Sequence, residues 1–153
     1  MPDTFEETVR ELGLCFFPGK QAIEGGATNR ITAKDTTKFA GSVQLDNDLE
    51  ESCPNDNRWD YVVAYDWGNN QSLYYIEIHP ASSTSQVNKI MAKKIWLDSW
   101  LMGDGNSLKI YSQNLKVGYY WIATGKVSPL DSPDRKKMAK KGIIGPLSRL
   151  EIK

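Results

Sequence analysis

WDYVVAYDWGNNQSLYYIEIH, residues 59–79, is the stretch of sequence that decides the fold. Two runs within it, Trp59–Asp66 and Leu73–His79, are dense in the aromatic and β-branched residues that favour strands. The segment Gly68–Asn70 between them is typical of a turn. The two runs are therefore predicted to pair antiparallel as a β-hairpin.

A long helix is predicted directly after the hairpin. Pro80 ends the second strand, and the serine and threonine residues that follow it are good N-cap residues. The helix is expected to run from about Thr84 to Met102 and to end at Gly103. A hairpin followed by a long helix and a returning strand predicts an α/β (α+β) fold, with a mixed central β-sheet flanked by helices.

Five further elements are expected around this centre. They are a helix over Thr4–Leu12, a strand over Lys38–Leu45, a strand over Tyr119–Thr124, a short basic helix over Asp131–Lys141 and an extended piece over Leu147–Ile152. The acidic stretch 46–57 is interpreted as a loop, and residues 16–37 indicate no definite element. A length of 153 residues predicts a single domain over 1–153.

The composition excludes several classes of protein. Nineteen basic residues balance nineteen acidic ones, whereas a dedicated nucleic-acid coat protein is normally basic. No run approaches the roughly 18 apolar residues of a membrane span, and the start of the chain lacks the pattern of a signal peptide. Cys15 and Cys53 match no metal-ligand spacing and are interpreted as free thiols. We therefore expect a cytoplasmic protein that does not enter the membrane.

Three polar side chains are expected to meet at one end of the hairpin. Side chains alternate between the two faces of a strand, so Glu77 and His79 point to the same side. Asp60 begins the preceding strand, and a hairpin places the start of one strand beside the end of the other. Carboxylate oxygens are the preferred ligands of Mg²⁺ and Mn²⁺. We predict a metal site at Asp60 and Glu77, with His79 beside it.

The long helix places a lysine on its apolar face. The apolar stripe of this helix is formed by Val87, Ile90, Met91, Leu97 and Leu101. Lys94 lies near the middle of this stripe, and Asp98 lies beside it. Because an unpaired buried charge is costly, Lys94 is expected either to pair with Asp98 or to reach the hairpin carboxylates. At the carboxylates, its ammonium would stabilise negative charge or orient a nucleophilic water.

The order of these elements resembles that of the PD-(D/E)xK nuclease superfamily. The segments RWDYVVAYD (58–66) and LYYIEIHPA (73–81) are similar to the two metal-binding strands of that family, and the resemblance covers about residues 38–124. It implies a restriction-endonuclease-like core. It also implies that Asp60 and Glu77 hold Mg²⁺, that the backbone carbonyl of Ile78 contacts the metal, and that water attacks a phosphodiester.

The chain departs from the family pattern at one position. His79 stands where the family has a lysine, so that Glu-x-His replaces Glu-x-Lys. In some relatives the following helix supplies this lysine. By resemblance, Lys94 is the candidate substitute, with Lys93 and Lys89 behind it.

The leading hypothesis is a Mg²⁺- or Mn²⁺-dependent nuclease that hydrolyses phosphodiester bonds of DNA or RNA. Asp60 and Glu77 would bind the metal, His79 would act as ligand or base, and Lys94 would orient water or stabilise charge. A third interpretation is an unrelated α/β fold in which Asp60, Glu77 and Lys94 form a structural ionic network.

The rival hypothesis is a catalytically inactive nuclease-fold module that binds a protein partner or nucleic acid. The helix face of Trp96 and Trp100 would then form an interface, including a homodimer interface, unless it packs against another layer of the same chain. The basic run 135–141 either contacts phosphates or is a solvated helix face. Asp46 is a further candidate ligand at the end of the first strand.

Overall fold

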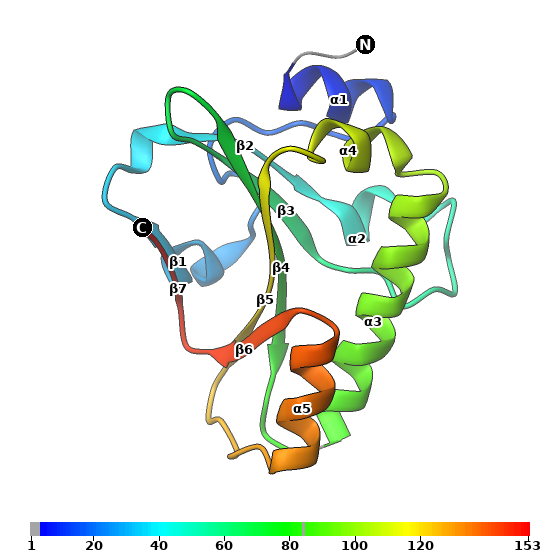
Figure 1. Cartoon of the computed structure of the whole chain (residues 1–153), viewed down its shortest axis with the longest axis vertical. Coiled ribbons are helices and arrows are strands. Elements are labelled where there is room, and N and C mark those ends of the chain that lie inside the picture. The colour runs from blue at the N-terminus through cyan, green and yellow to red at the C-terminus, as the bar shows by residue number, and fades with distance from the viewer. Residues whose placement is uncertain (1–3, 84) are drawn as a thin grey trace.

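The computed structural model describes residues 4–83 and 85–153. Its helices and strands are arranged around one five-stranded sheet (Figure 1). In chain order, with η for 3-10 helices, the elements are α1 (Phe5–Glu11), η1 (Gly25–Arg30), β1 (Ile31–Ala33), η2 (Thr36–Lys38), β2 (Phe39–Gln44), α2 (Leu45–Asp48), β3 (Tyr61–Asp66), β4 (Gln71–Pro80), α3 (Ser85–Met102), α4 (Asn106–Tyr111), β5 (Lys116–Thr124), α5 (Ser132–Lys140), β6 (Ile143–Leu147) and β7 (Leu150–Ile152).

The five-stranded sheet is mixed, with the strand order β2-β3-β4-β5-β6. Strands β2, β3 and β4 form an antiparallel meander, whereas β5 is parallel to β4 and β6 is parallel to β5. Helix α3 lies on the crossover between β4 and β5, as a parallel connection requires. A second, two-stranded parallel sheet joins β1 to β7. The predicted mixed α/β architecture is confirmed.

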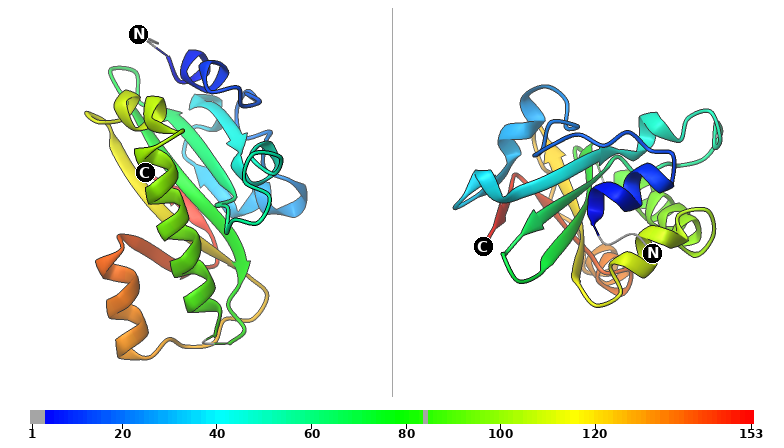
Figure 2. Two further views of the ribbon diagram at one scale, coloured as in Figure 1. Left: turned by 90° about the vertical axis from the view of Figure 1, so that its right-hand side faces the viewer. Right: turned by 90° about the horizontal axis from the view of Figure 1, so that it is seen from above.

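The two faces of the sheet are covered differently (Figure 2). Leu73 and Tyr75 of β4 lie on the face that packs against α1, α3 and α4. Tyr74 and Ile76 lie on the opposite face, which is covered by residues from the segment before β2 and from β7. This alternation buries β4 on both faces. It also directs the odd-numbered side chains of β4 toward α3, which places Glu77 and His79 under that helix.

The central elements agree with the prediction. Strands β3 and β4 pair antiparallel with Asp66 opposite Gln71, which confirms the hairpin. Helix α1 begins after Thr4, whose side chain accepts a hydrogen bond from the Glu7 N–H at 3.1 Å. The predicted start of the long helix at Thr84 lies outside the described residues, and α3 is described from Ser85 to Met102.

The short elements differ from the prediction. Helix α4 and strand β1 were not expected, the loop that was predicted over 46–57 begins inside the short helix α2, and the extended piece over 147–152 falls in two strands. Strand β6 ends at Leu147, and β7 begins at Leu150. Elements of three to six residues form because they pack on other parts of the chain, and such packing leaves no periodic pattern in the sequence.

Two expectations about the environment of the chain are met in the described residues. In this part of the chain, no helix is long and apolar enough to span a membrane. Cys15 and Cys53 are free thiols, as predicted.

Candidate functional site

Asp60 and Glu77 lie opposite each other where β3 and β4 part. The hairpin register pairs Tyr61 with Ile76, so the next position along each strand brings Asp60 opposite Glu77. The Asp60 N–H donates to Oε1 of Glu77 at 3.0 Å, and the Ile78 N–H donates to Oδ2 of Asp60 at 3.0 Å. These two backbone-to-side-chain hydrogen bonds extend the pairing of β3 and β4 beyond the last paired residues, Tyr61 and Ile76. They hold both carboxyl groups at one end of the hairpin.

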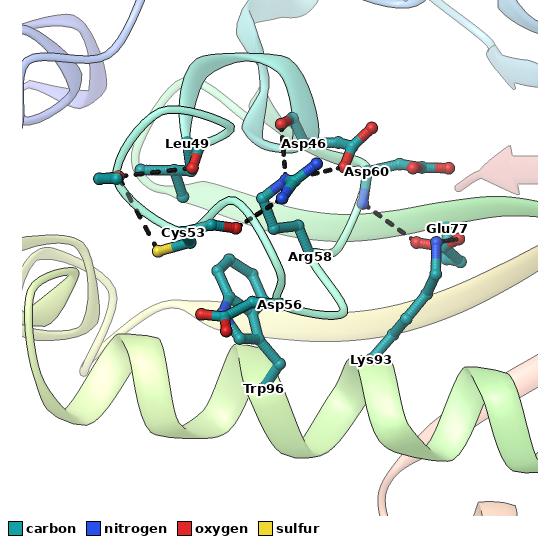
Figure 3. A network of polar contacts seen from close by, with 10 residues as sticks. Asp46, Leu49, Cys53, Asp56, Arg58, Asp60, Glu77, Lys93 and Trp96 are labelled. Carbon is teal, nitrogen blue, oxygen red and sulfur yellow. Dashed lines mark hydrogen bonds and ion pairs between the residues drawn. The ribbon is translucent and has the colours of Figure 1, made fainter.

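Lys93 of α3 completes this pair (Figure 3). Its Nζ donates to Oε2 of Glu77 at 2.5 Å. The Glu77 side chain is fully buried, and the Lys93 side chain is 20% exposed. The lysine was predicted only as a second choice behind Lys94. We call Asp60, Glu77 and Lys93 the carboxylate–lysine cluster.

The electrostatics of the cluster are unbalanced, because two carboxyl groups share one ammonium. Burial, followed by the negative charge of Asp60, raises the pKa of Glu77 well above 4.5, although Lys93 acts in the opposite direction. Burial also raises the pKa of Asp60 above 3.8. For Lys93, burial alone would lower the pKa, but the attraction of Glu77, Asp60 and Asp46 outweighs it and the pKa is raised above 10.5. Lys93 is therefore positively charged, and its charge favours the ionised form of Glu77.

His79 borders the cluster, as predicted. Its Nδ1 lies 3.8 Å from Oε2 of Glu77, and its Nε2 lies 2.5 Å from Oε1 of Gln86 on α3. The backbone carbonyl of His79 accepts a hydrogen bond from Nε1 of Trp121 at 2.9 Å. The contact with Gln86 holds the imidazole ring with Nδ1 on the side of Glu77.

Asp46 lies close to the cluster but is engaged elsewhere. Its carboxylate pairs with Nε of Arg58 at 3.0 Å, and Arg58 also donates to the backbone carbonyl of Cys53 at 2.5 Å. The Asp46 N–H contacts the carbonyl oxygen of Asp60 at 3.4 Å. The negative charge of Asp46 adds to the rise in the pKa of Asp60, after burial. Asp46 therefore contributes to the field of the site and is itself neutralised by Arg58.

Lys94 does not reach the carboxylates. Its Nζ donates to Oδ1 of Asp98 at 2.6 Å, one helical turn further on, and lies 4.0 Å from the ring centre of Tyr119 on β5. Of the two arrangements that the sequence left open for Lys94, the structure adopts the pair with Asp98. The side chain beside Glu77 is Lys93. Helical spacing shows which residues face a sheet, but it does not show which strand lies beneath each of them.

The helix face with Trp96 and Trp100 is largely covered by the chain itself. Trp100 is 7% exposed and belongs to the main core, where its ring packs so closely on Gly105 that no Cβ would fit there. Trp96 stacks on Trp100 with ring centroids 6.0 Å apart, and its Nε1 donates to Asp56 at 3.1 Å. Of the two possibilities left open for this helix face, Trp100 packs against another part of the same chain, and Trp96 is half-buried beside the loop 53–58.

The donor set of the site contains two carboxyl groups and little else. Within the described residues, no group of three or more His, Cys, Asp or Glu side chains is arranged to hold a metal ion. Asp60 and Glu77 together offer only oxygen ligands, which excludes the nitrogen and sulfur environment of a structural zinc site. A hard cation that keeps water and binds substrate oxygens is the type of metal that such a pair accommodates.

A scan against protein-family models and searches of curated proteins and of solved structures found no match for this chain.

Proposed function

We propose that this protein is a Mg²⁺- or Mn²⁺-dependent phosphodiesterase that hydrolyses nucleic acid, built on a restriction-endonuclease-like core. The observation that carries the proposal is the carboxylate–lysine cluster, in which Lys93 donates to the buried Glu77 and Asp60 lies opposite. The resemblance noted in the sequence implies two carboxylates and one lysine at this place. The lysine missing from position 79 is supplied by α3.

A divalent metal fits the residues that are present. Asp60 and Glu77 would hold it, with the carbonyl of Ile78 as a further oxygen donor, and one ammonium cannot neutralise both carboxylates. Mg²⁺ commonly binds through one or two carboxylates and completes its shell with water and substrate phosphate. When bound, the metal would supply Lewis-acid polarisation of the phosphodiester and activation of water.

The protein side chains would act around the scissile phosphate. The Lys93 ammonium would stabilise the negative charge that develops on the phosphoryl oxygens. His79, held by Gln86, would take a proton from the attacking water or bind the metal. The water oxygen bonds to phosphorus, the bond from phosphorus to the leaving nucleoside oxygen breaks, and that oxygen takes up a proton. One water molecule is consumed, and nothing is oxidised or reduced.

The order of elements supports the same proposal. A helix, an antiparallel meander, the crossover helix α3 and a strand parallel to β4 follow one another. Glu77 lies on β4 and Asp60 directly precedes β3, and Lys93 reaches from α3 toward Glu77 (Figure 3). This placement leaves Asp60, Lys93 and His79 partly exposed, while Glu77 is fully buried behind them.

The experiment is a cleavage assay on single-stranded DNA, duplex DNA and RNA with Mg²⁺, Mn²⁺ or EDTA. We expect metal-dependent cleavage by the wild type and a loss of at least about 100-fold in rate for Glu77→Gln. Glu11→Gln, the same change at an exposed position on α1, is the matched control and should cleave like the wild type. A Glu77→Gln protein as active as the wild type would contradict the proposal.

A second candidate is a catalytically inactive module of the same fold that binds nucleic acid or a protein. The observation in its favour is that both oxygens of Glu77 already accept hydrogen bonds, as in a structural ionic network. A wild-type protein that binds nucleic acid but cleaves none of the substrates with either metal would establish this alternative. Its interface would not be centred on Trp100, because that side chain is buried.

A further inference from the structure

Helix α5 carries a dense set of basic side chains on its solvent side. Asp131 caps the helix by accepting from the Asp134 N–H at 2.9 Å, and Met138 is the residue that anchors it, with 2% of its surface exposed. The basic residues of α5 and its C-cap are all exposed. They are Arg135, Lys136, Lys137, Lys140 and Lys141, and we call them the α5 basic face.

The charge of this face is not neutralised by the protein. In the part of the chain that the structure describes, Arg10, Arg58, Lys93 and Lys94 all form close ion pairs, whereas no residue of the α5 basic face does. The balanced net charge of the chain conceals a strong asymmetry. The first 60 residues carry twelve acidic and six basic side chains, and the remaining residues carry seven acidic and thirteen basic ones.

Helix α5 lies close to the carboxylate–lysine cluster. Met138 packs in one apolar cluster with Ile90 of α3 and Trp121 of β5. Trp121 is the register partner of Glu77 on the neighbouring strand, and its indole donates to the backbone carbonyl of His79 at 2.9 Å. Figure 2 shows α5 beside the N-terminal half of α3. Met138 of α5 therefore packs on β5, the strand next to the one that carries Glu77.

We infer that the α5 basic face binds the phosphate backbone of nucleic acid and holds the substrate next to the cluster, without reading its sequence. This inference rests on the proposed function, since it names the surface that would bind the substrate of that site. Lysine and arginine pairing with phosphates supplies most of the sequence-independent affinity for nucleic acid. An anionic membrane is the less suitable partner, because the large apolar residue of α5, Met138, is buried and leaves nothing to insert into lipid.

The test measures binding of a fluorescent DNA duplex in EDTA over a series of salt concentrations, so that no cleavage occurs. The variant is Lys136→Gln/Lys140→Gln, which removes two charges from the outer side of α5. The matched control is Lys109→Gln/Lys116→Gln, the same change at exposed positions at the opposite end of the sheet (Figure 1). Thermal unfolding verifies that both variants are folded.

We expect the α5 variant to bind roughly tenfold more weakly and its log–log salt slope to fall by about 1.8, or 0.9 for each phosphate that the protein no longer neutralises. The control variant should bind like the wild type. The inference is overturned if the α5 variant keeps the wild-type affinity and slope, or if the control is weakened as much. Binding to phosphatidylserine vesicles is measured in parallel. The inference is also overturned if the α5 variant loses vesicle binding and keeps its affinity for the DNA duplex.

The failure of this inference can be told apart from that of the proposed function. Glu11→Gln, the exposed control on α1, should bind the duplex like the wild type. Binding through α5 without cleavage in Mn²⁺ would refute the phosphodiesterase and keep the inference. Metal-dependent cleavage by a protein whose affinity for DNA is unchanged by the α5 substitutions would keep the phosphodiesterase and refute the inference.

Discussion

Two lysines that are neighbours on α3 form ion pairs of almost equal length in opposite surroundings. Lys93 lies 2.5 Å from Glu77, whose side chain is fully buried, and Lys94 lies 2.6 Å from Asp98, which is 46% exposed. The first pair joins α3 to β4, and the second joins two turns of α3. The distance between charges therefore does not distinguish the two pairs. The burial of the carboxylate and its other neighbours do.

The difference lies in what each lysine balances. Lys94 and Asp98 form a closed pair beside the ring of Tyr119, with one cation for one anion. Lys93 faces Glu77 and Asp60 together, and burial raises the pKa of both carboxyl groups. The region around Lys93 thus has two buried or half-buried carboxyl groups for one cation. The region around Lys94 has one carboxylate for one cation.

The largest expected effect is on catalysis. Lys93→Met should lower the rate of metal-dependent cleavage by roughly 10²–10³-fold, because one donor to the transition-state charge is removed. Lys94→Met should stay within about tenfold of the wild type, since the Lys94 ammonium pairs with Asp98 and not with Glu77 or Asp60. Initial rates under saturating metal measure both. Equal losses in the two variants would remove the distinction between the pairs.

The next effect is on stability. Lys93→Met leaves Glu77 buried without its cation and should cost about 3 kcal/mol of unfolding free energy at neutral pH. Lys94→Met should cost about 1 kcal/mol, because water reaches Asp98 and solvates the charge that remains. Urea unfolding gives both values. In the double variant Glu77→Gln/Lys93→Met, most of the stability should be restored, and a sum of the single effects would show that the two residues are not coupled.

A smaller effect is on the pH dependence of stability. The pKa of Glu77 is raised in the folded protein, so the folded protein keeps a proton that the unfolded chain loses above about 4.5. Stability should therefore fall as the pH rises from 4.5 through the raised pKa of Glu77. Glu77→Gln should make this fall shallower. Thermal midpoints in metal-free buffer measure it, and an unchanged slope in Glu77→Gln would show that Glu77 ionises as it does in the unfolded chain.

Much of this arrangement could be predicted from the sequence, because the two strands of the hairpin are neighbours along the chain. The turn at Gly68 and the period of two along β4 were enough to bring Asp60, Glu77 and His79 to one place. The choice between Lys93 and Lys94 could not be made in this way. The choice depends on where α3 lies over the sheet. That position is set by packing between residues far apart in the sequence, such as Met138 and Ile90.

The coverage of the tryptophans has the same cause. The loop and the turn that cover Trp100 have no sequence period, so helical spacing alone did not show what packs on it. The small β1–β7 sheet joins residues more than a hundred positions apart, and its three-residue strands exist because they pair. Long-range packing, rather than local propensity, is the part that the sequence alone left undetermined.

The most direct test of the carboxylate–lysine cluster is a calorimetric titration with Mn²⁺, with and without a phosphorothioate oligonucleotide that supplies phosphate ligands. The wild type and Asp98→Asn should both show saturable binding, and Asp60→Asn should show none. Binding that survives Asp60→Asn, or no binding by the wild type even with the oligonucleotide, would contradict the claim that Asp60 and Glu77 form a metal-dependent catalytic site.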